Sequence, residues 1–179
     1  MAISILELIA VGVMNILFTG LFYELEKKTK FGKWKRVYQQ ILIGVVFGGI
    51  SVLGTELGQT VNGATLNFRD AAPLCAGLLF GAPAGIIAGV IGGVERYFAV
   101  YWGAGTFTQI ACSISTVIAG LAGAAFRKWM FDDKKPNWFY ALAIAMVVEV
   151  IHMLMIFLTN IDQVTRAFET VERISLWMI

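Results

Sequence analysis

Charged residues are scarce in this chain. Asp, Glu, Lys and Arg make up 15% of its 179 residues, whereas hydrophobic residues make up 58% and the mean hydropathy is +0.75. Soluble domains carry roughly a quarter charged residues, so this composition excludes an ordinary soluble domain. Apolar stretches and short loops take up almost the whole chain, which predicts a single integral membrane domain.

Cysteine and catalytic motifs are sparse as well. The two cysteines, Cys75 and Cys112, fall in apolar runs, where they behave as small hydrophobes without the spacing of a metal or redox site. No nucleophile is paired with a base, and no phosphate-binding loop is present. We therefore expect no catalytic residue, metal site or cofactor here, and we assign any enzymatic output to a segment after Ile179.

What the chain does have is apolar runs long enough to cross a membrane, which takes about twenty residues in a helix. Residues 3–25 form the first run, and positive charge follows it instead of preceding it, so we interpret it as a retained transmembrane helix and not a cleavable signal. Five further runs cover about 39–58, 70–98, 107–126, 137–159 and 171–179. The last run stops short, which predicts a truncated helix.

Two basic loops set the expected topology. Six of the 14 Lys and Arg residues lie in 26–36, and the segment 127–135 is also basic. By the positive-inside rule both loops should be cytoplasmic, with the N-terminus outside. An even number of crossings must then separate the two loops, but the apolar runs between them number three.

A turn inside the run 70–98 resolves this conflict. Gly81 tolerates a helix end, and Pro83 suits the first position of a new helix. The sequence therefore predicts two helices, 70–81 and 84–100, joined at the inner face. The alternative is one long helix that is kinked at Pro83.

The predicted turn brings two polar ends together on the outer side. The first helix starts with Asn67, Arg69 and Asp70, and the second ends with Glu95 and Arg96. We expect these five residues to be neighbours at the extracellular mouth and to form part of a ligand site. Three more polar residues fall near the outer ends of their spans and indicate an outward-facing polar pocket: Glu56, Asn62 and Gln109.

Arg69 and Arg96 are the candidate anion-binding residues. Arginine stays charged, and its planar guanidinium can hold a carboxylate or phosphate with two parallel hydrogen bonds. Alternatively, Arg69 pairs with Asp70 or Glu95, or both arginines reach the membrane interface.

Glycines recur every four residues along the same stretch, at Gly81, Gly85, Gly89 and Gly93, with Gly77 before them and Gly92 beside them. Such spacing puts small residues on one helix face, which lets another backbone approach closely. Arg96 shares this face and should point into the bundle, and Gly44 and Gly48 form a second packing pair. Ala88 lies about 100° away and should accept a leucine better than Gly89.

Glu149 and His152 lie three residues apart inside the run 137–159, so they share a helix face. An ionisable group at membrane depth usually faces a cavity or a partner, so we expect both residues to contribute to the ligand site. The alternative is a buried pair that only fixes helix packing. His152 is the sole histidine and could also sense pH, since its charge changes near neutrality.

Four motifs carry a resemblance to a known family: "NFRDAAP", "GLLFGAPAGIIAGVIGGVERY", "ACSISTVIAGLAGAAFRKW" and "EVIHM". Through them the chain resembles the five-transmembrane receptor domain of the LytS–YhcK type (5TM LYT) over residues 38–179. Residues 1–37 are then an added N-terminal helix with its basic loop. The chain departs from the family pattern at Trp177 and Met178, and in "FAVYWGAG" after the Arg-Tyr pair, which leaves the ligand open.

The resemblance implies an all-α integral membrane protein with a polytopic helical bundle. Its core would be a six-helix bundle similar to the substrate-binding subunits of energy-coupling-factor transporters, plus the N-terminal helix, with the last helix incomplete. It also implies a multi-pass protein of the bacterial plasma membrane that senses a small extracellular ligand for a histidine kinase or diguanylate cyclase. We expect a homodimer through the full-length protein and no nucleic acid partner.

A second function is a substrate-binding subunit of a vitamin transporter of the energy-coupling-factor type. The coding sequence after Ile179 separates the two functions. A cytoplasmic kinase or cyclase domain there would support the receptor, whereas a stop after one more helix would support the transporter.

Overall fold

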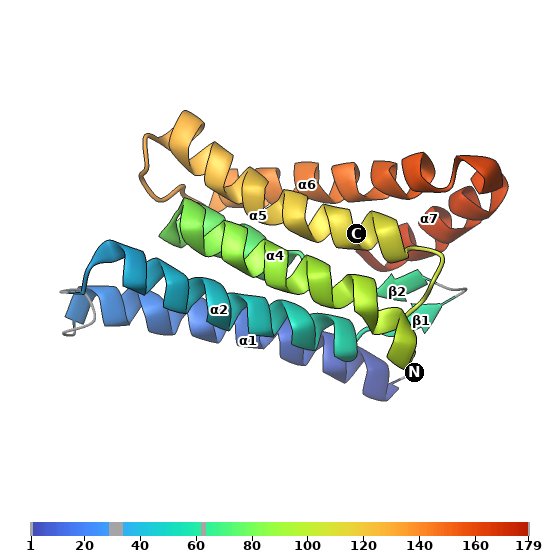
Figure 1. Ribbon diagram of the computed structural model, residues 1–179, viewed down its shortest axis with the longest axis horizontal. Helices are drawn as coiled ribbons and strands as arrows, with labels where there is room; N and C mark the ends of the chain where they lie inside the picture. Colours follow the sequence, from blue (N-terminus) through green and yellow to red (C-terminus); the bar gives the residue numbers. More distant parts are fainter. Residues whose placement is uncertain (1, 29–33, 62–63, 179) are drawn as a thin grey trace.

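Seven α-helices make up most of the described part of the computed structural model, which comprises residues 2–28, 34–61 and 64–178 (Figure 1). The helices are α1 (Ala2–Lys28), α2 (Arg36–Glu56), α3 (Ala71–Cys75), α4 (Ala82–Phe98), α5 (Gln109–Phe131), α6 (Trp138–Thr159) and α7 (Val164–Met178). Shorter elements are a π-helix, η2 (Ala76–Phe80), and the 3-10 helices η3 (Ala99–Trp102) and η4 (Ile161–Gln163). Two strands, β1 (Gln59–Val61) and β2 (Ala64–Leu66), form an antiparallel pair.

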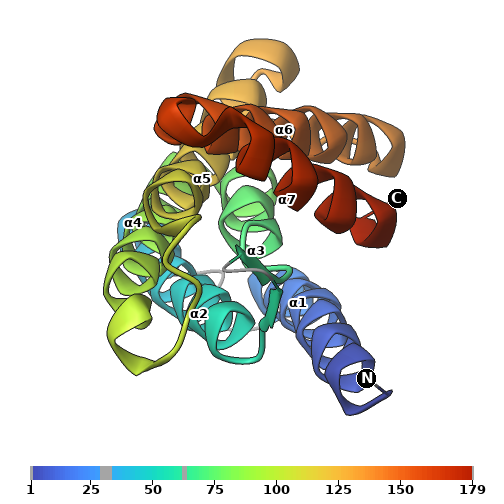
Figure 2. The ribbon, with the colours of Figure 1, turned by 90° about the vertical axis from the view of Figure 1, so that its right-hand side faces the viewer.

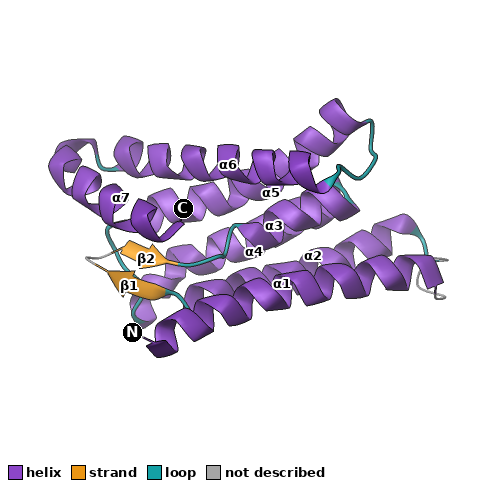
Figure 3. Cartoon of the chain, turned by 180° about the vertical axis from the view of Figure 1, so that it is seen from behind, coloured by secondary structure: helices purple, strands orange, loops and turns teal. Residues whose placement is uncertain are grey.

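Five helices within these residues are long and apolar enough to cross a membrane. They are α1 from Ile9, α2, α4 together with η3, α5 and α6. With the composition, these spans make the chain a polytopic helical membrane protein. The expected all-α class is correct for the spans, but the connection after α2 is a short β-hairpin and not a plain loop (Figure 3).

The predicted turn between two helices is confirmed. The π-helix η2 ends at Phe80, and Gly81 follows with φ 126°, a backbone conformation that favours glycine. Pro83 then lies in the first turn of α4. The Gln40 side chain on α2 donates a hydrogen bond of 3.0 Å to the Phe80 carbonyl, which the break leaves without a helical partner. The structure therefore has two helices here and not one kinked helix.

The elements sort to two ends of the bundle (Figure 1). The "basic end" holds the end of α1, the start of α2, the Gly81 turn and the connection from α5 to α6. The "strand end" holds β1, β2, the end of α4 and the start of α1 (Figure 2). The described parts of both basic segments thus lie at one end, as an even number of crossings requires, and which end is cytoplasmic stays a prediction.

Helix α4 is packed at close range on both sides. On one side, a Cβ atom on Gly44 or Gly48 of α2 would lie 2.8 Å from the Cβ of Ile87 or Ile91. On the other side, a Cβ on Gly85 would lie 2.6 Å from the Cα of Gly77 and close to the backbone of α5. The glycine pattern is therefore a packing interface, as expected.

Ala88 is as tightly enclosed as the glycines, so whether it accepts a leucine better than Gly89 stays a prediction. Ala88 is fully buried in a core cluster with Phe47 of α2 and Phe80 of η2. It faces α2 while Gly85, Gly89 and Gly93 face α5, because α4 lies between two neighbours. Phe22 of α1 joins the same cluster, with ring centroids 6.2 Å from those of Phe47 and Phe80, so α1 is packed onto the bundle.

The last helix begins earlier than the apolar run indicated. Helix α7 starts at Val164, not near residue 171, and it is not among the five candidate spans. Ala167 of α7 is buried against Ala111 and Ile156, so α7 packs on α5 and α6 at the strand end. The side chains of Trp177 and Met178 lie outside the described part of the chain.

Candidate functional site

Arg69 is buried completely, just before α3. Its backbone can come close to α2 because position 54 is glycine, where a Cβ would lie 3.0 Å from the Arg69 Cα. The Arg69 Nε donates to Thr116 Oγ1 at 2.6 Å and lies 3.3 Å from Asp70 Oδ1. The Asn67 side chain accepts a hydrogen bond from the Arg69 backbone N–H at 3.1 Å, which fixes the backbone just before α3.

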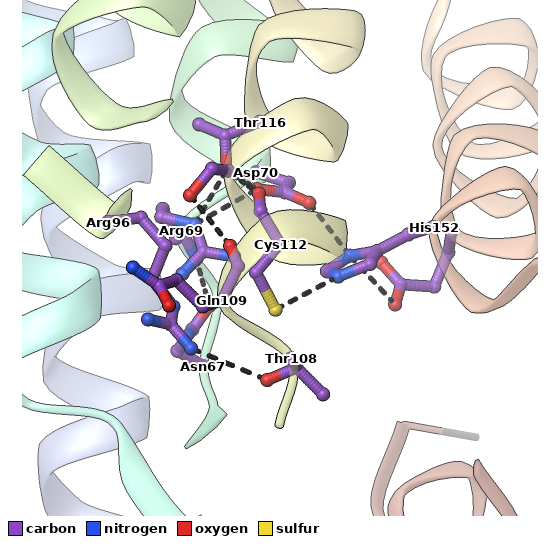
Figure 4. Close-up of polar contacts among 11 residues, drawn as sticks. Asn67, Arg69, Asp70, Arg96, Thr108, Gln109, Cys112, Thr116 and His152 are labelled. Carbon is purple, nitrogen blue, oxygen red and sulfur yellow. Dashed lines mark hydrogen bonds and ion pairs between the residues drawn. The ribbon is translucent and has the colours of Figure 1, made fainter. Parts of the chain in front are cut away.

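Asp70 joins three helices through one carboxylate (Figure 4). Its Oδ1 accepts a hydrogen bond from Thr116 of α5 at 2.6 Å, and its Oδ2 lies 2.8 Å from Nδ1 of His152 on α6. All three side chains are at least nine-tenths buried. Charged and polar groups are thus paired across α3, α5 and α6 in the interior of the bundle.

Arg96 is the second fully buried arginine. Its Nη2 donates to the carbonyl of Gly105 at 2.6 Å and to Thr108 Oγ1 at 3.4 Å, so the loop from α4 to α5 folds over the guanidinium. Arg96 therefore points into the bundle, as predicted from its place on the glycine face.

Four nitrogen atoms of these two guanidiniums have no hydrogen-bond partner in the described part of the chain. They are Nη1 and Nη2 of Arg69 and Nε and Nη1 of Arg96. A buried unpaired donor costs about 1–3 kcal/mol, and a charged one costs more. Such donors in a folded protein are normally satisfied by a protein group, water or a ligand.

Cys112 lies where these cations meet. It is within electrostatic reach of Arg69, Arg96 and His152, and its Sγ is 3.4 Å from the His152 Nε2 (Figure 4). Sequence reasoning treated this cysteine as a small hydrophobe and did not single out the threonines. The signal was present, since Thr108, Cys112 and Thr116 recur every four residues on one face at the start of α5.

The two glutamates stand at the edge of this cluster. Glu95 is half-buried and within electrostatic reach of both arginines. Glu149 Oε1 lies 3.8 Å from His152 Nδ1, and its side chain is 36% exposed. The structure thus brings all seven predicted site residues to one region, which reaches from the strand end into the interior.

Their expected place at the open mouth is wrong for the arginines and for Asp70. These three side chains are inside the bundle, because the loop from α4 to α5 covers Arg96 and the backbone before α3 runs close to α2. Asp70 also contacts His152 of α6. The alternative that Arg69 pairs with Asp70 holds for its Nε only, and neither arginine reaches the interface.

Outer polar residues close the strand end. Glu56 at the end of α2 accepts a hydrogen bond from the indole N–H of Trp102 in η3. Gln109 donates to the Tyr97 carbonyl at 2.7 Å. These contacts fix the connection that covers Arg96, whereas Asn62, also expected in the pocket, lies outside the described residues.

Comparison with known proteins points to membrane sensors. The family described as "5TMR of 5TMR-LYT" matches residues 19–179. Sensor histidine kinase BtsS of Escherichia coli K12 is 30% identical over 125 residues, which are 68% of this chain and 21% of that protein. Sensor histidine kinase YpdA of the same strain is 28% identical over 116 residues, covering 65% of this chain and 20% of that protein.

The chain therefore spans about a fifth of the length of the curated relatives it matches. A BtsS protein of Shigella flexneri matches over the same share. No solved structure matches the chain, so the likeness to transporter subunits stays a prediction.

Proposed function

The chain belongs to the 5TMR-LYT family, and from this premise we propose that it binds a small anionic ligand from outside the cell and signals to a C-terminal output domain. It is a membrane sensor input domain like those of the histidine kinases BtsS and YpdA. The ligand class, the direction of access and the relay are the parts that we propose.

The four unpaired guanidinium nitrogens carry the proposal. Arg69 and Arg96 are both fully buried, they repel each other electrostatically, and each keeps donors that the described residues do not use. A carboxylate or phosphate would satisfy these donors in pairs and would offset the repulsion between two buried cations. Cys112 and Thr108 would form the neutral part of the same site.

The pair of Asp70 and His152 is the proposed relay. Arg69 contacts Asp70, and Asp70 contacts His152 on α6. An anion that binds Arg69 would therefore weaken the contact between Arg69 and Asp70, and so change how Asp70 holds His152. A ligand shifts a helix arrangement only if it binds one arrangement more tightly than the other. We propose that the ligand-bound arrangement places α6 and α7 differently from the free one, and that a dimer of full-length chains transmits the difference.

The ligand can be sought by thermal unfolding of the purified chain in detergent. Small organic carboxylates and inorganic phosphate are titrated against sodium chloride of equal ionic strength, and saturable stabilisation identifies a ligand. Arg69→Gln and Arg96→Gln should then weaken its binding by about tenfold to a hundredfold, since each removes a charge-assisted contact. Glu149→Gln should change binding less, because Glu149 lies at the edge of the cluster.

Lys128→Gln is the matched control, since it removes one exposed positive charge far from this cluster. It should bind the ligand like the unmodified chain. Equal affinity in Arg69→Gln, Arg96→Gln and the control would mean that the arginines serve only the architecture.

Orientation is tested by cysteine labelling in a background that lacks Cys75 and Cys112. We predict that a cysteine at position 82, in the turn at the basic end, is labelled only from the cytoplasmic side. A cysteine at 101–105, at the strand end, should be labelled from outside. Labelling of position 82 from outside alone would reverse the proposed topology.

A further inference from the structure

A cavity of about 310 Å³ lies at the basic end, between the end of α1, the start of α2, η2 and the end of α5. It is at the opposite end of the bundle from β1 and β2, the strands that precede Arg69 in the chain (Figure 1). None of the seven predicted site residues lines it. The cavity is therefore independent of the proposed receptor site.

Positive charge dominates the walls of this cavity. Arg36, Arg127 and Lys135 line it, and Glu26 is the one acidic residue among the described lining residues. Glu26 pairs with Lys135 at 3.1 Å, and the Lys135 ammonium also lies 4.3 Å from the centroid of the Tyr23 ring. Lys135 is thus already partnered, which leaves the two arginines as the cations that face the space.

Arg127 is buried yet incompletely paired. Its side chain is only 7% exposed, and its Nη1 donates a long hydrogen bond of 3.3 Å to the Leu78 carbonyl. Its Nε has no hydrogen-bond partner in the described part of the chain, and the nearest carboxylate oxygen in a described ion pair, Asp133 Oδ1, is 4.0 Å away. Asp133 is itself mostly exposed, so it compensates the buried charge weakly, and Glu26 acts on Arg127 only at longer range while its Oε2 pairs with Lys135.

Arg36 adds a second guanidinium to the same space. Arg36 and Arg127 are close enough to repel each other, and both line the cavity. Two arginines of like charge around one hollow favour an anion between them. Phosphate oxygens match the fork of donors on each guanidinium better than a single chloride ion does.

We propose that this cavity binds a phosphate group with net negative charge, carried by an anionic phospholipid headgroup or free in solution. Basic pockets between membrane helices at the level of the headgroups are a common form of lipid site. Trp34 lines the cavity and is half-exposed, and tryptophan is enriched at the interface between membrane and water. Occupancy would hold α1, α2 and α5 together beside the Gly81 turn.

The test uses the purified chain in detergent micelles with three probes: dioctanoylphosphatidylglycerol, dioctanoylphosphatidylcholine and inorganic phosphate. Binding is measured as the saturable rise in unfolding temperature at constant ionic strength. We expect phosphatidylglycerol to bind and phosphatidylcholine not to, since its choline would meet the cationic wall. Arg36→Gln and Arg127→Gln should each weaken the binding by about tenfold to a hundredfold.

Matched controls remove the neighbouring charges. Lys35→Gln and Lys128→Gln each delete one exposed cation next to a lining arginine, without touching the cavity. They should bind the probes like the unmodified chain. If Arg127→Gln does not fold, Arg36→Gln still decides the matter, because Arg36 is exposed and its loss leaves the packing intact.

The outcomes separate the two sources of the phosphate. Binding of phosphatidylglycerol but not inorganic phosphate, lost in the arginine variants only, assigns the site to a lipid headgroup. Binding of both probes with the same loss assigns it to a phosphate group as such. Equal weakening in the lysine controls would show a diffuse attraction and overturn the proposal. Saturable binding of neither phosphatidylglycerol nor inorganic phosphate would also overturn it.

Discussion

Helices α4 and α6 are both apolar spans, but they are held in the bundle in different ways. Helix α4 meets η2 and α5 backbone to backbone through glycines, and on its other side Ile87 and Ile91 fill the space left by Gly44 and Gly48 of α2. Helix α6 has four buried residues, Ile144, Val148, His152 and Ile156, spaced four apart. One helix is therefore fixed by close packing, and the other by a single seam of side chains that includes an ion pair.

This difference matters because lipid is as apolar as most side chains. Without a strong hydrophobic effect between helices in a membrane, close packing and polar contacts decide how firmly they associate. Helix α4 has the close packing, whereas the polar contacts of α6 run through His152 to Asp70 and Cys112. In the proposed relay α4 would be the fixed part and α6 the part that changes place.

The largest effect should come from removing Asp70. Asp70→Ala leaves His152 and Arg69 without their shared carboxylate in the interior, and breaking a buried pair in this way costs about 3–5 kcal/mol. We expect this loss in the free energy of unfolding, measured by chemical unfolding of the purified chain in mixed micelles. Asp162→Ala, which removes an exposed carboxylate at the strand end, serves as the control.

Asp162→Ala should change the free energy of unfolding by less than about 0.5 kcal/mol. If Asp70→Ala lowered the free energy of unfolding as little as Asp162→Ala, α6 would be held by its apolar residues alone. Polar contacts would then not distinguish α6 from α4.

An intermediate effect should follow from filling the glycine interface. In Gly85→Ala the new methyl group would lie 2.6 Å from the Gly77 Cα and 2.7 Å from the Gly120 carbonyl oxygen, both of which are backbone atoms that cannot turn aside. Such overpacking costs about 1–3 kcal/mol. The measurement is again the free energy of unfolding in mixed micelles.

Gly49→Ala is the matched control, because a Cβ at this helical position meets no atom within 4 Å. It should be neutral, or stabilising by about 0.5–1 kcal/mol, since alanine favours a helix more than glycine does. A similar loss in both variants would show that helix propensity, and not close packing, governs these positions.

The parts of this fold that sequence could predict rest on strong local rules. Basic loops have to share a side, so parity required a turn, and Gly81 with Pro83 marked the place. The spacing of the glycines likewise predicted that Arg96, on the same helix face, points into the bundle. The family resemblance was also sound, since the family match covers residues 19–179.

The parts that sequence missed depend on which faces meet in three dimensions. Cys112 and Thr116 sit in an apolar run, and although their spacing put them on one face, the groups that this face meets, from α6 and the start of α3, are known only from the packing. The burial of Ala88 was not visible either, because the glycines on α4 marked one interface while the second, against α2, depends on the packing of Phe47 and Phe80. The burial of Arg96 depends on the loop from α4 to α5, and that of Arg69 on the close approach of its backbone to α2, and no local pattern fixes either.

The smallest effect should come from trimming the α6 seam itself. Ile156 is 2% exposed and packs among side chains from α5 and α7, which can shift slightly to fill a gap. Ile156→Val should therefore cost about 0.5–1.5 kcal/mol in the free energy of unfolding. Leu158→Val removes the same amount of carbon from a side chain that is 67% exposed, and we expect almost no change there. A loss for Ile156→Val larger than that for Gly85→Ala would make α6 the more tightly packed helix and would reverse the comparison on which the proposed relay depends.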